Sequence, residues 1–253
     1  MKYLLHITDN HLFADATKAG YGGIVPYESL VRVLQQAFQH APGNIDAVIV
    51  TGDISGDNSK LSYHHFLQLV SQYIHVPVYV IPGNHDDNAY FDTQLTAYHL
   101  RAGEPLQLEN WRIHGIDTRY QGTRGQVNAQ QLSAIAKDIH SHSTAFNLLA
   151  MHHHVLSSKS WMDKHELINA GEFIDWLMQT PNINGIVHGH VHAPLQGYVD
   201  AKKRIPVFAG PSSCWQWEMT ESFSLSHDKP GYQFITLHDN GRITCDVRRI
   251  ETL

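Results

Sequence analysis

Five short polar clusters in the first three-quarters of the chain carry residue types that bind metal ions. Each cluster directly follows a short apolar run, so each is predicted to leave the end of a β-strand. The end of a strand is held rigidly by the sheet, so the loop that follows it can direct a side chain into a shared cleft. Five such ends along one sheet edge would therefore assemble ligands from distant parts of the chain. The clusters are Asp9-Asn10-His11, Gly52-Asp53, Gly83-Asn84-His85-Asp86, His152-His153-His154 and Gly189-His190-Val191-His192.

The spacing inside two clusters suggests paired ligands. Asp9 and His11 are two residues apart, and so are His190 and His192. In an extended segment residues i and i+2 face the same side, so we expect each pair to reach one ion.

Single donors from the other clusters complete the set. Asp53 is an isolated carboxylate, Asn84 offers a neutral amide oxygen, and His152 is the first histidine after its strand. Mixed nitrogen and oxygen donors without thiolate favour Mn, Fe, Co or Zn over copper, calcium or magnesium. These residues suffice for two metal ions that share one carboxylate, and such a site suits an anionic phosphodiester.

The stretches between the clusters alternate between strand and helix patterns as far as residue 190. Strands are predicted over 3–8, 47–50, 76–81, 146–151 and 185–188, helices over 26–40, 60–74, 88–100, 128–140 and 172–179, and a hairpin over 106–117. Four further β runs at 195–199, 205–209, 232–237 and 242–250, with turns at 200–203 and 239–241, predict an antiparallel part. We expect one domain over residues 1–253 with a β-rich part from about residue 194.

The composition excludes several classes of protein. Of 253 residues, 42% are apolar and 17% charged, as in large globular proteins, and the net charge of −6 disfavours nucleic-acid binding. The short basic cluster Lys202-Lys203-Arg204 also fits a solvated hairpin turn. Cys214 and Cys245 form no disulfide framework, so we expect reduced thiols in a cytoplasmic protein. The chain lacks an apolar run of 18 residues, so we expect no membrane contact.

The ordered set D-x-H, GD, GNH[DE], H and GHxH resembles the calcineurin-like metallophosphoesterases over nearly the whole chain. The chain looks closest to their bacterial class III 3′,5′-cyclic AMP phosphodiesterases. This narrower resemblance is carried by Ile7-Thr8-Asp9-Asn10-His11-Leu12-Phe13, the histidine triplet, Asn169-Ala170-Gly171-Glu172, Pro211-Ser212-Ser213-Cys214 and Pro230-Gly231-Tyr232. The resemblance implies a four-layer α/β/β/α sandwich of two mixed β-sheets flanked by helices.

The resemblance also implies roles for the clustered residues. The family usually binds Fe and Mn, and sometimes Zn or Co. Asp9, His11 and His192 would hold the first metal ion, and Asn84, His152 and His190 the second, with Asp53 as the bridge. His85 would stabilise the transition state or protonate the leaving oxygen, and the alternative is a purely structural hydrogen bond. Asp86 is expected to orient or cap its neighbours rather than to take part in the reaction.

The implied activity is hydrolysis of a phosphodiester, 3′,5′-cyclic AMP to 5′-AMP, through attack by a hydroxide that bridges the metals. One alternative is another phosphoesterase of the same superfamily, with a glycerophosphodiester, nucleotide-lipid or phosphomonoester substrate. The other is a scaffold that binds proteins without catalysis, against which the complete ligand set argues. We expect a small phosphodiester, most simply a cyclic nucleotide, as the partner of a monomer or homodimer.

Substrate choice is expected to lie in three long irregular segments, 14–25, 157–171 and 211–231. An aromatic residue there could stack on a nucleobase, and the candidates are Trp161, Trp215, Trp217 and Phe223. For Trp215 and Trp217 the alternative is packing of a loop or a dimer contact. His154 could face the same way as His152 and contact the substrate. The role of His153 stays open.

Overall fold

The computed structural model describes residues 1–200 and 205–251. The predicted basic cluster at 202–204 and most of the predicted turn at 200–203 lie outside the described residues.

The first of two mixed sheets has the strand order β13-β12-β1-β2-β3. Strands β1 (Lys2–Ile7), β2 (Ala47–Thr51) and β3 (Val78–Ile81) are parallel, so their carboxyl ends lie at one edge. Strand β12 (Gly231–Leu237) runs antiparallel to β1, and β13 (Ile243–Arg249) antiparallel to β12.

The second sheet has the strand order β10-β11-β9-β8-β5-β4. Its four central strands are parallel, and the short edge strands are antiparallel to their neighbours. The central strands are β5 (Trp111–Ile116), β8 (Phe146–Met151), β9 (Ile183–His188) and β11 (Pro206–Ala209), and the edges are β4 (Leu106–Leu108) and β10 (Gln196–Tyr198). A separate two-stranded ladder joins β6 (Arg119–Gln121) and β7 (Arg124–Gly125).

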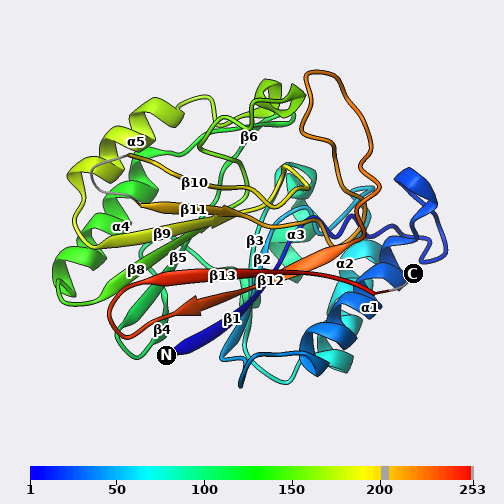
Figure 1. Ribbon diagram of the computed structural model, residues 1–253, viewed down its shortest axis with the longest axis horizontal. Helices are drawn as coiled ribbons and strands as arrows, with labels where there is room; N and C mark the ends of the chain where they lie inside the picture. Colours follow the sequence, from blue (N-terminus) through cyan, green and yellow to red (C-terminus); the bar gives the residue numbers. More distant parts are fainter. Residues whose placement is uncertain (201–204, 252–253) are drawn as a thin grey trace.

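Helices cover the outer face of each sheet (Figure 1). One core packs α1 (Pro26–Gln39), α2 (Lys60–Tyr73) and α3 (Ala89–Gln94) against the first sheet. Another packs α4 (Ala129–Ser141) and α5 (Ala170–Gln179) against the second. Between the sheets lies a third core that includes Ile49, Trp111, Leu148 and Ile235. The predicted four-layer sandwich is confirmed.

Local sequence signals account for where the longer helices begin. Pro26 occupies the first turn of α1, where its missing N–H costs nothing. The Ser59 side chain accepts a hydrogen bond from the Ser62 backbone N–H at the start of α2. The Asn128 side chain caps α4 in the same way. Short 3₁₀ turns occur at η1 (Tyr21–Gly23), η2 (Asn84–Asp86), η3 (Thr96–Tyr98) and η4 (Trp161–His165).

Two predictions about the elements are wrong in part. The helix expected over 88–100 ends at Gln94, because the following chain turns back to β3, where Leu100 donates its backbone N–H to the Val80 carbonyl. The four C-terminal strands do not form an antiparallel sheet of their own. They are divided between the two sheets, and β11 pairs in parallel with β9.

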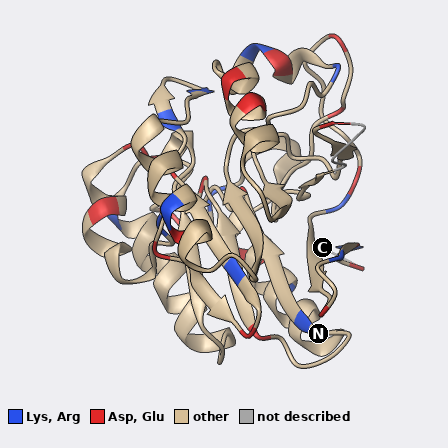
Figure 2. Ribbon diagram, turned by 90° about the vertical axis from the view of Figure 1, so that its left-hand side faces the viewer, with Lys and Arg blue, Asp and Glu red and all other residues tan. Residues whose placement is uncertain are grey.

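Within residues 1–200 and 205–251, no helix is both long enough and apolar enough to cross a membrane. Acidic and basic residues are interspersed over helices and loops in the view of Figure 2.

Candidate metal centre and substrate cavity

An unusual backbone conformation marks the loops that carry the predicted ligands. Asp9, His11, Asp53, His190 and His192 have φ between 47° and 70°, in the left-handed region that non-glycine residues rarely occupy. Each such residue costs about 1–3 kcal/mol and persists only where its surroundings enforce it. The expectation of extended i, i+2 pairs is therefore wrong.

Glycines allow these loops to pack against one another. Gly52 has a φ of 92°, and a Cβ there would lie 2.5 Å from the Gly83 nitrogen and 2.6 Å from His152 Nδ1. A Cβ on Gly189 would overlap the Thr8 hydroxyl. Glycine is required wherever backbone approaches a neighbour this closely.

The first ligand group gathers Asp9, His11 and His192, whose donor atoms all lie within 4.8 Å of one another. His192 Nε2 lies 3.3 Å from Asp9 Oδ1 and 3.0 Å from His11 Nε2. His192 Nδ1 donates to the Trp215 carbonyl at 2.9 Å, which leaves the Nε2 lone pair facing the group.

The second group gathers Asp53, Asn84, His152 and His190. His152 Nε2 lies 3.4 Å from Asp53 Oδ2, 3.2 Å from Asn84 Oδ1 and 3.2 Å from His190 Nδ1. His190 and His192 thus belong to different groups, although their spacing predicted a common ion. This division agrees with the assignment that the family resemblance implies.

Hydrogen bonds to backbone carbonyls determine which ring nitrogens of His152 and His190 face the second group. His152 Nδ1 donates to the Thr51 carbonyl at 2.7 Å, and His190 Nε2 donates to the His165 carbonyl at 2.9 Å. In the neutral rings the two nitrogens that face each other are therefore both lone pairs. Two lone pairs 3.2 Å apart repel unless a proton or a metal ion lies between them, so the residues fit a metal ion that takes the place of the proton.

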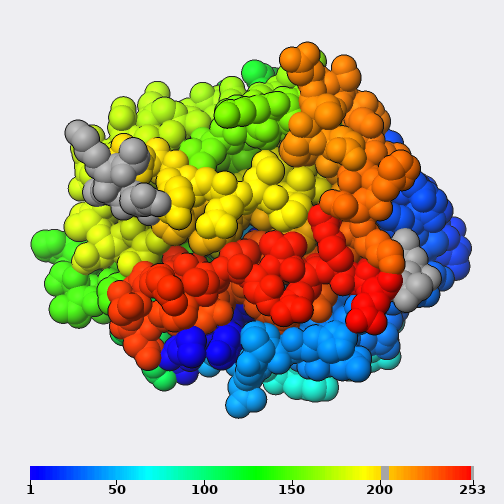
Figure 3. Space-filling view, in the orientation of Figure 1, coloured from blue at the N-terminus to red at the C-terminus, as the bar shows by residue number. Residues whose placement is uncertain are grey.

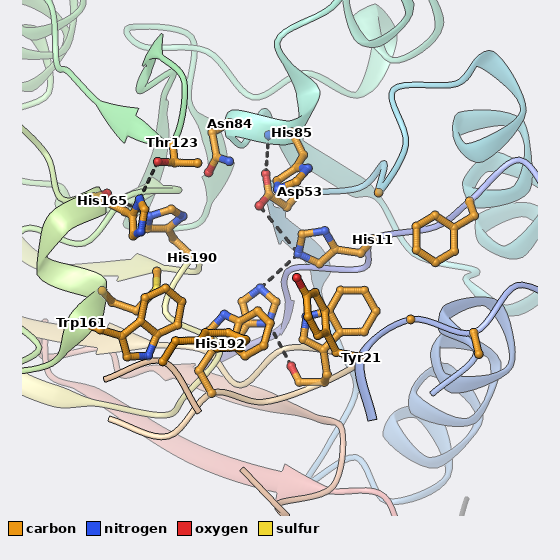
Figure 4. A pocket seen from close by; sticks show the side chains of 18 of the residues that line it. His11, Tyr21, Asp53, Asn84, His85, Thr123, Trp161, His165, His190 and His192 are labelled. Carbon is orange, nitrogen blue, oxygen red and sulfur yellow. Dashed lines mark hydrogen bonds and ion pairs between the residues drawn. The ribbon is translucent and has the colours of Figure 1, made fainter. Parts of the chain in front are cut away.

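Asp53 lies between the two groups (Figure 4). Its Oδ2 is 3.7 Å from His11 Nε2 and 3.4 Å from His152 Nε2, so one oxygen faces both groups. Its Oδ1 accepts the His85 backbone N–H at 2.8 Å. The His85 ring meets the His11 ring edge-on at 4.9 Å, and its donor atoms lie within 4.8 Å of those of His11 and Asp53.

The electrostatics of the two groups also favour a cation. Burial opposes ionisation of Asp53, but the neighbouring His152, His85 and His11 outweigh it and hold its pKa well below the usual range. Burial likewise opposes a charge on His152, yet Asp53, Asp9 and the Thr51 carbonyl raise its pKa to about 9. Burial and the adjacent histidines keep the pKa of His190 well below its usual value. The raised pKa of His152 shows that the buried carboxylates stabilise a positive charge at this place, and a metal ion would supply that charge instead of the proton.

Asp86 joins the loop that carries Asp53 to the loop that carries Asn84. Its carboxylate accepts backbone N–H groups from Gly83 at 3.0 Å and from Ile54 and Ser55 at 3.1 Å each. It also accepts the Tyr63 hydroxyl at 2.8 Å. These contacts are those of the orienting residue that the sequence predicts.

A cavity of about 870 Å³ opens over both ligand groups. His11, Asp53, Asn84, His190 and His192 reach its surface, as does His85, whereas Asp9 and His152 do not line it. Both tryptophans predicted to contact substrate, Trp161 and Trp215, line the cavity. Trp215 is only 5% exposed and stacks on the His11 ring at 5.1 Å.

The structure separates His154 from the cavity. His154 is buried behind His190, with ring centroids 5.7 Å apart, and its Nε2 lies 3.5 Å from Asp163 Oδ1. His153 is also buried, and its Nδ1 bonds to the Thr118 hydroxyl at 2.7 Å. Among the three neighbouring histidines, His152 alone joins a ligand group.

Several cavity residues are absent from the set that the sequence predicts. His165 orients His190 through its backbone carbonyl, and its ring bonds to Thr123, which also lines the cavity. A backbone acceptor leaves no signature in sequence. Trp217 and Phe223, aromatic residues that the sequence offered for stacking, line the cavity as well, and so does Tyr21.

Two phosphatases are among the solved structures that share this architecture. A dimetal phosphatase from Danio rerio superposes with a TM-score of 0.67 over 98% of this chain and 96% of that chain, at 14% identity. A purple acid phosphatase from yellow lupin seeds gives a TM-score of 0.68 over 98% of this chain and 51% of its own, also at 14% identity. These likenesses show that the chain has the fold of the metallophosphoesterases.

Sequence comparison gives the family. The profile of the calcineurin-like phosphoesterases matches residues 2–194, and the chain belongs to this family. It is 31% identical over 252 residues to a Haemophilus influenzae protein named 3′,5′-cyclic adenosine monophosphate phosphodiesterase CpdA, covering 98% of this chain and 90% of the relative. The protein of that name from Escherichia coli K12 is 30% identical over 251 residues, covering 98% and 89%.

Proposed function

We propose that this protein is a two-metal phosphodiesterase that hydrolyses 3′,5′-cyclic AMP to 5′-AMP. The observation that carries the proposal is the pair of ligand groups joined by Asp53, on a chain that matches cyclic AMP phosphodiesterases over nearly its whole length. Asp9, His11 and His192 would hold one ion and Asn84, His152 and His190 the other. Donors without thiolate suit Fe and Mn, and Zn or Co would also fit.

Two ions held there would lower the pKa of a nearby water and neutralise charge on the phosphoryl oxygens. The chain's own contribution is to fix the ligands before substrate arrives. The carbonyls of Thr51, His165 and Trp215 set the tautomers of His152, His190 and His192, so that each of these three rings presents a lone pair.

His85 is the residue we assign to the leaving group. In hydrolysis, oxygen from water bonds to phosphorus, the bond from phosphorus to O3′ breaks, and O3′ takes a proton. The His85 side chain lines the cavity, and its backbone is tied to Asp53. An imidazole in this position can deliver that proton near neutral pH.

A panel of substrates tests the proposal. The Mn-loaded protein is assayed on 3′,5′-cyclic AMP, cyclic GMP, 2′,3′-cyclic AMP, an aryl phosphodiester and an aryl phosphomonoester. We expect turnover of 3′,5′-cyclic AMP to 5′-AMP and preference for diesters over the monoester. Activity on the monoester alone would refute the cyclic-nucleotide assignment, and inactivity without bound metal would refute the enzyme assignment.

A further inference from the structure

The cavity has two chemically different halves. One half is formed by the ligand groups and His85. The other is an aromatic wall of Tyr21, Trp161, Trp217 and Phe223, contributed by three loops far apart in sequence. In Figure 3 the segment 211–231, in orange, lies beside the blue N-terminal residues, and Tyr21 meets Trp217 with ring centroids 5.2 Å apart. Asn84 and His85 lie across the cavity from Trp161 and Tyr21 in Figure 4.

The rings of the aromatic wall form one continuous surface that begins at the metal centre. Trp217 stacks on His192 at 4.8 Å, and Phe223 follows at 5.2 Å from Trp217. Trp161 contacts Phe223 at 5.0 Å and is held by its backbone N–H to the Thr220 carbonyl at 2.8 Å. A phosphate at the ligands would therefore place an attached ring system against this surface.

Burial distinguishes the wall from ordinary packing. Tyr21 and Phe223 are each 52% exposed although they lie at the mouth of a cavity. Trp215, by contrast, is packed between His11 and Gly20, where a Cβ would overlap its ring. Exposed aromatic faces beside a polar site are typical of a binding surface.

The charges around the cavity indicate which group the wall accepts. Among the described residues that line it, Asp53 is the only carboxylate and Lys18 the only lysine or arginine. Aromatic rings can also hold a quaternary ammonium, but the wall contains no carboxylate to pair with that charge, and the Lys18 ammonium at the cavity lies over Phe13. A neutral, flat ring system gains by stacking on such a surface.

We propose that the aromatic wall is a nucleobase-binding subsite, an inference that rests on the proposed cyclic-nucleotide phosphodiesterase activity. Stacking acts on the face of the base, which every base possesses, so the wall should favour cyclic AMP and cyclic GMP alike over a cyclic phosphate without a base.

The test compares 3′,5′-cyclic AMP with the 3′,5′-cyclic phosphate of methyl riboside, which has no base. We expect Phe223→Ala and Tyr21→Ala each to lower the ratio of kcat/KM for cyclic AMP to kcat/KM for the base-free substrate about tenfold, and to weaken calorimetric binding of 5′-AMP to the Mn-loaded protein. Tyr90→Ala removes an aromatic residue that is 44% exposed and lies outside the cavity, and should leave both quantities unchanged.

An unchanged ratio in the Phe223 and Tyr21 variants would overturn the subsite. The subsite would also be overturned if the Phe223 and Tyr21 variants lost activity only on glycerophosphocholine, which is a probe for binding of a quaternary ammonium. If the wild-type protein fails to hydrolyse cyclic AMP, the proposed function is refuted separately. Binding of 5′-AMP then tests the subsite by itself. Weaker binding of 5′-AMP by Phe223→Ala than by the wild-type protein would support the subsite, and equal binding would overturn it.

Discussion

Gly83 shows how tightly single residues constrain the metal centre. Its φ of −98° is open to any residue, so a substitution there tests space rather than backbone strain. A Cβ at Gly83 would overlap Asp53 Oδ1, the oxygen that accepts the His85 N–H. The position therefore links the shape of one loop directly to the carboxylate that faces both ligand groups.

We expect Gly83→Ala to displace Asp53 and to reduce both metal content and turnover by at least tenfold, since misplacement by about 1 Å can cost 100-fold. The matched control is Gly171→Ala, because nothing lies within 4 Å of a Cβ there. Metal analysis and kcat/KM of both variants check this. Equal, near wild-type values for the two variants would show that the Asp53 position is not critical.

The gathering of the candidate ligand residues at one site could be predicted, because their types and their places after apolar runs are local features. The family resemblance implies the division of His190 and His192 between two groups, but their spacing does not, because the division depends on left-handed backbone conformations. Contact between loops enforces these conformations, and such contacts are not encoded in any one segment. His154 shows the same limit, since its triplet does not reveal which ring joins a ligand group.

At the scale of elements, Asp86 holds the loop after β2 against the loop after β3. The Asp86 carboxylate is fully buried and accepts four hydrogen bonds. Asparagine in its place would point its NH₂ group, itself a donor, at some of these N–H and O–H donors. We expect Asp86→Asn to lower the free energy of unfolding by about 1–3 kcal/mol and to weaken metal binding. Urea denaturation and metal titration measure the two effects.

The neighbouring Asp87→Asn is the control, because Asp87 is exposed and should change neither quantity by more than about 0.5 kcal/mol. Similar small effects in both variants would mean that Asp86 does not hold the two loops together.

Strand and helix positions followed from apolar periodicity, and hairpin pairs such as β4–β5 and β12–β13 followed from their turns, whereas partners that are distant in sequence did not. The runs after residue 193 were recognisable as strands, but their partners β1 and β9 are distant in sequence. The β6–β7 ladder and the turn η4 are short and polar, so periodicity could not indicate them. Both belong to the surroundings of the cavity, through Thr123 and His165.

For the molecule as a whole, buried histidines outside the ligand groups should make stability depend on pH. Burial lowers the pKa of His6 and of His114 from 6.5 to about 4. The unfolded chain then binds more protons between these values, so the stabilising contribution is complete above pH 6.5 and is lost as the pH falls toward 4. The loss is roughly 1 kcal/mol per histidine and pH unit.

His114→Gln should therefore flatten the dependence of the urea midpoint on pH between 6.5 and 4, relative to the wild-type protein. The comparison between the two proteins isolates this histidine from the ligand histidines, which titrate in both. Parallel pH profiles would contradict the assignment of a buried, neutral His114.

The central claim is that seven side chains hold two ions with Asp53 between them. Anomalous diffraction from a Mn-loaded crystal tests this most directly. We predict two peaks about 3.5–4 Å apart, one beside Asp9, His11 and His192 and the other beside Asn84, His152 and His190. Asn84→Ala should weaken only the second peak. A single peak, or peaks that Asp53 does not contact, would contradict the account.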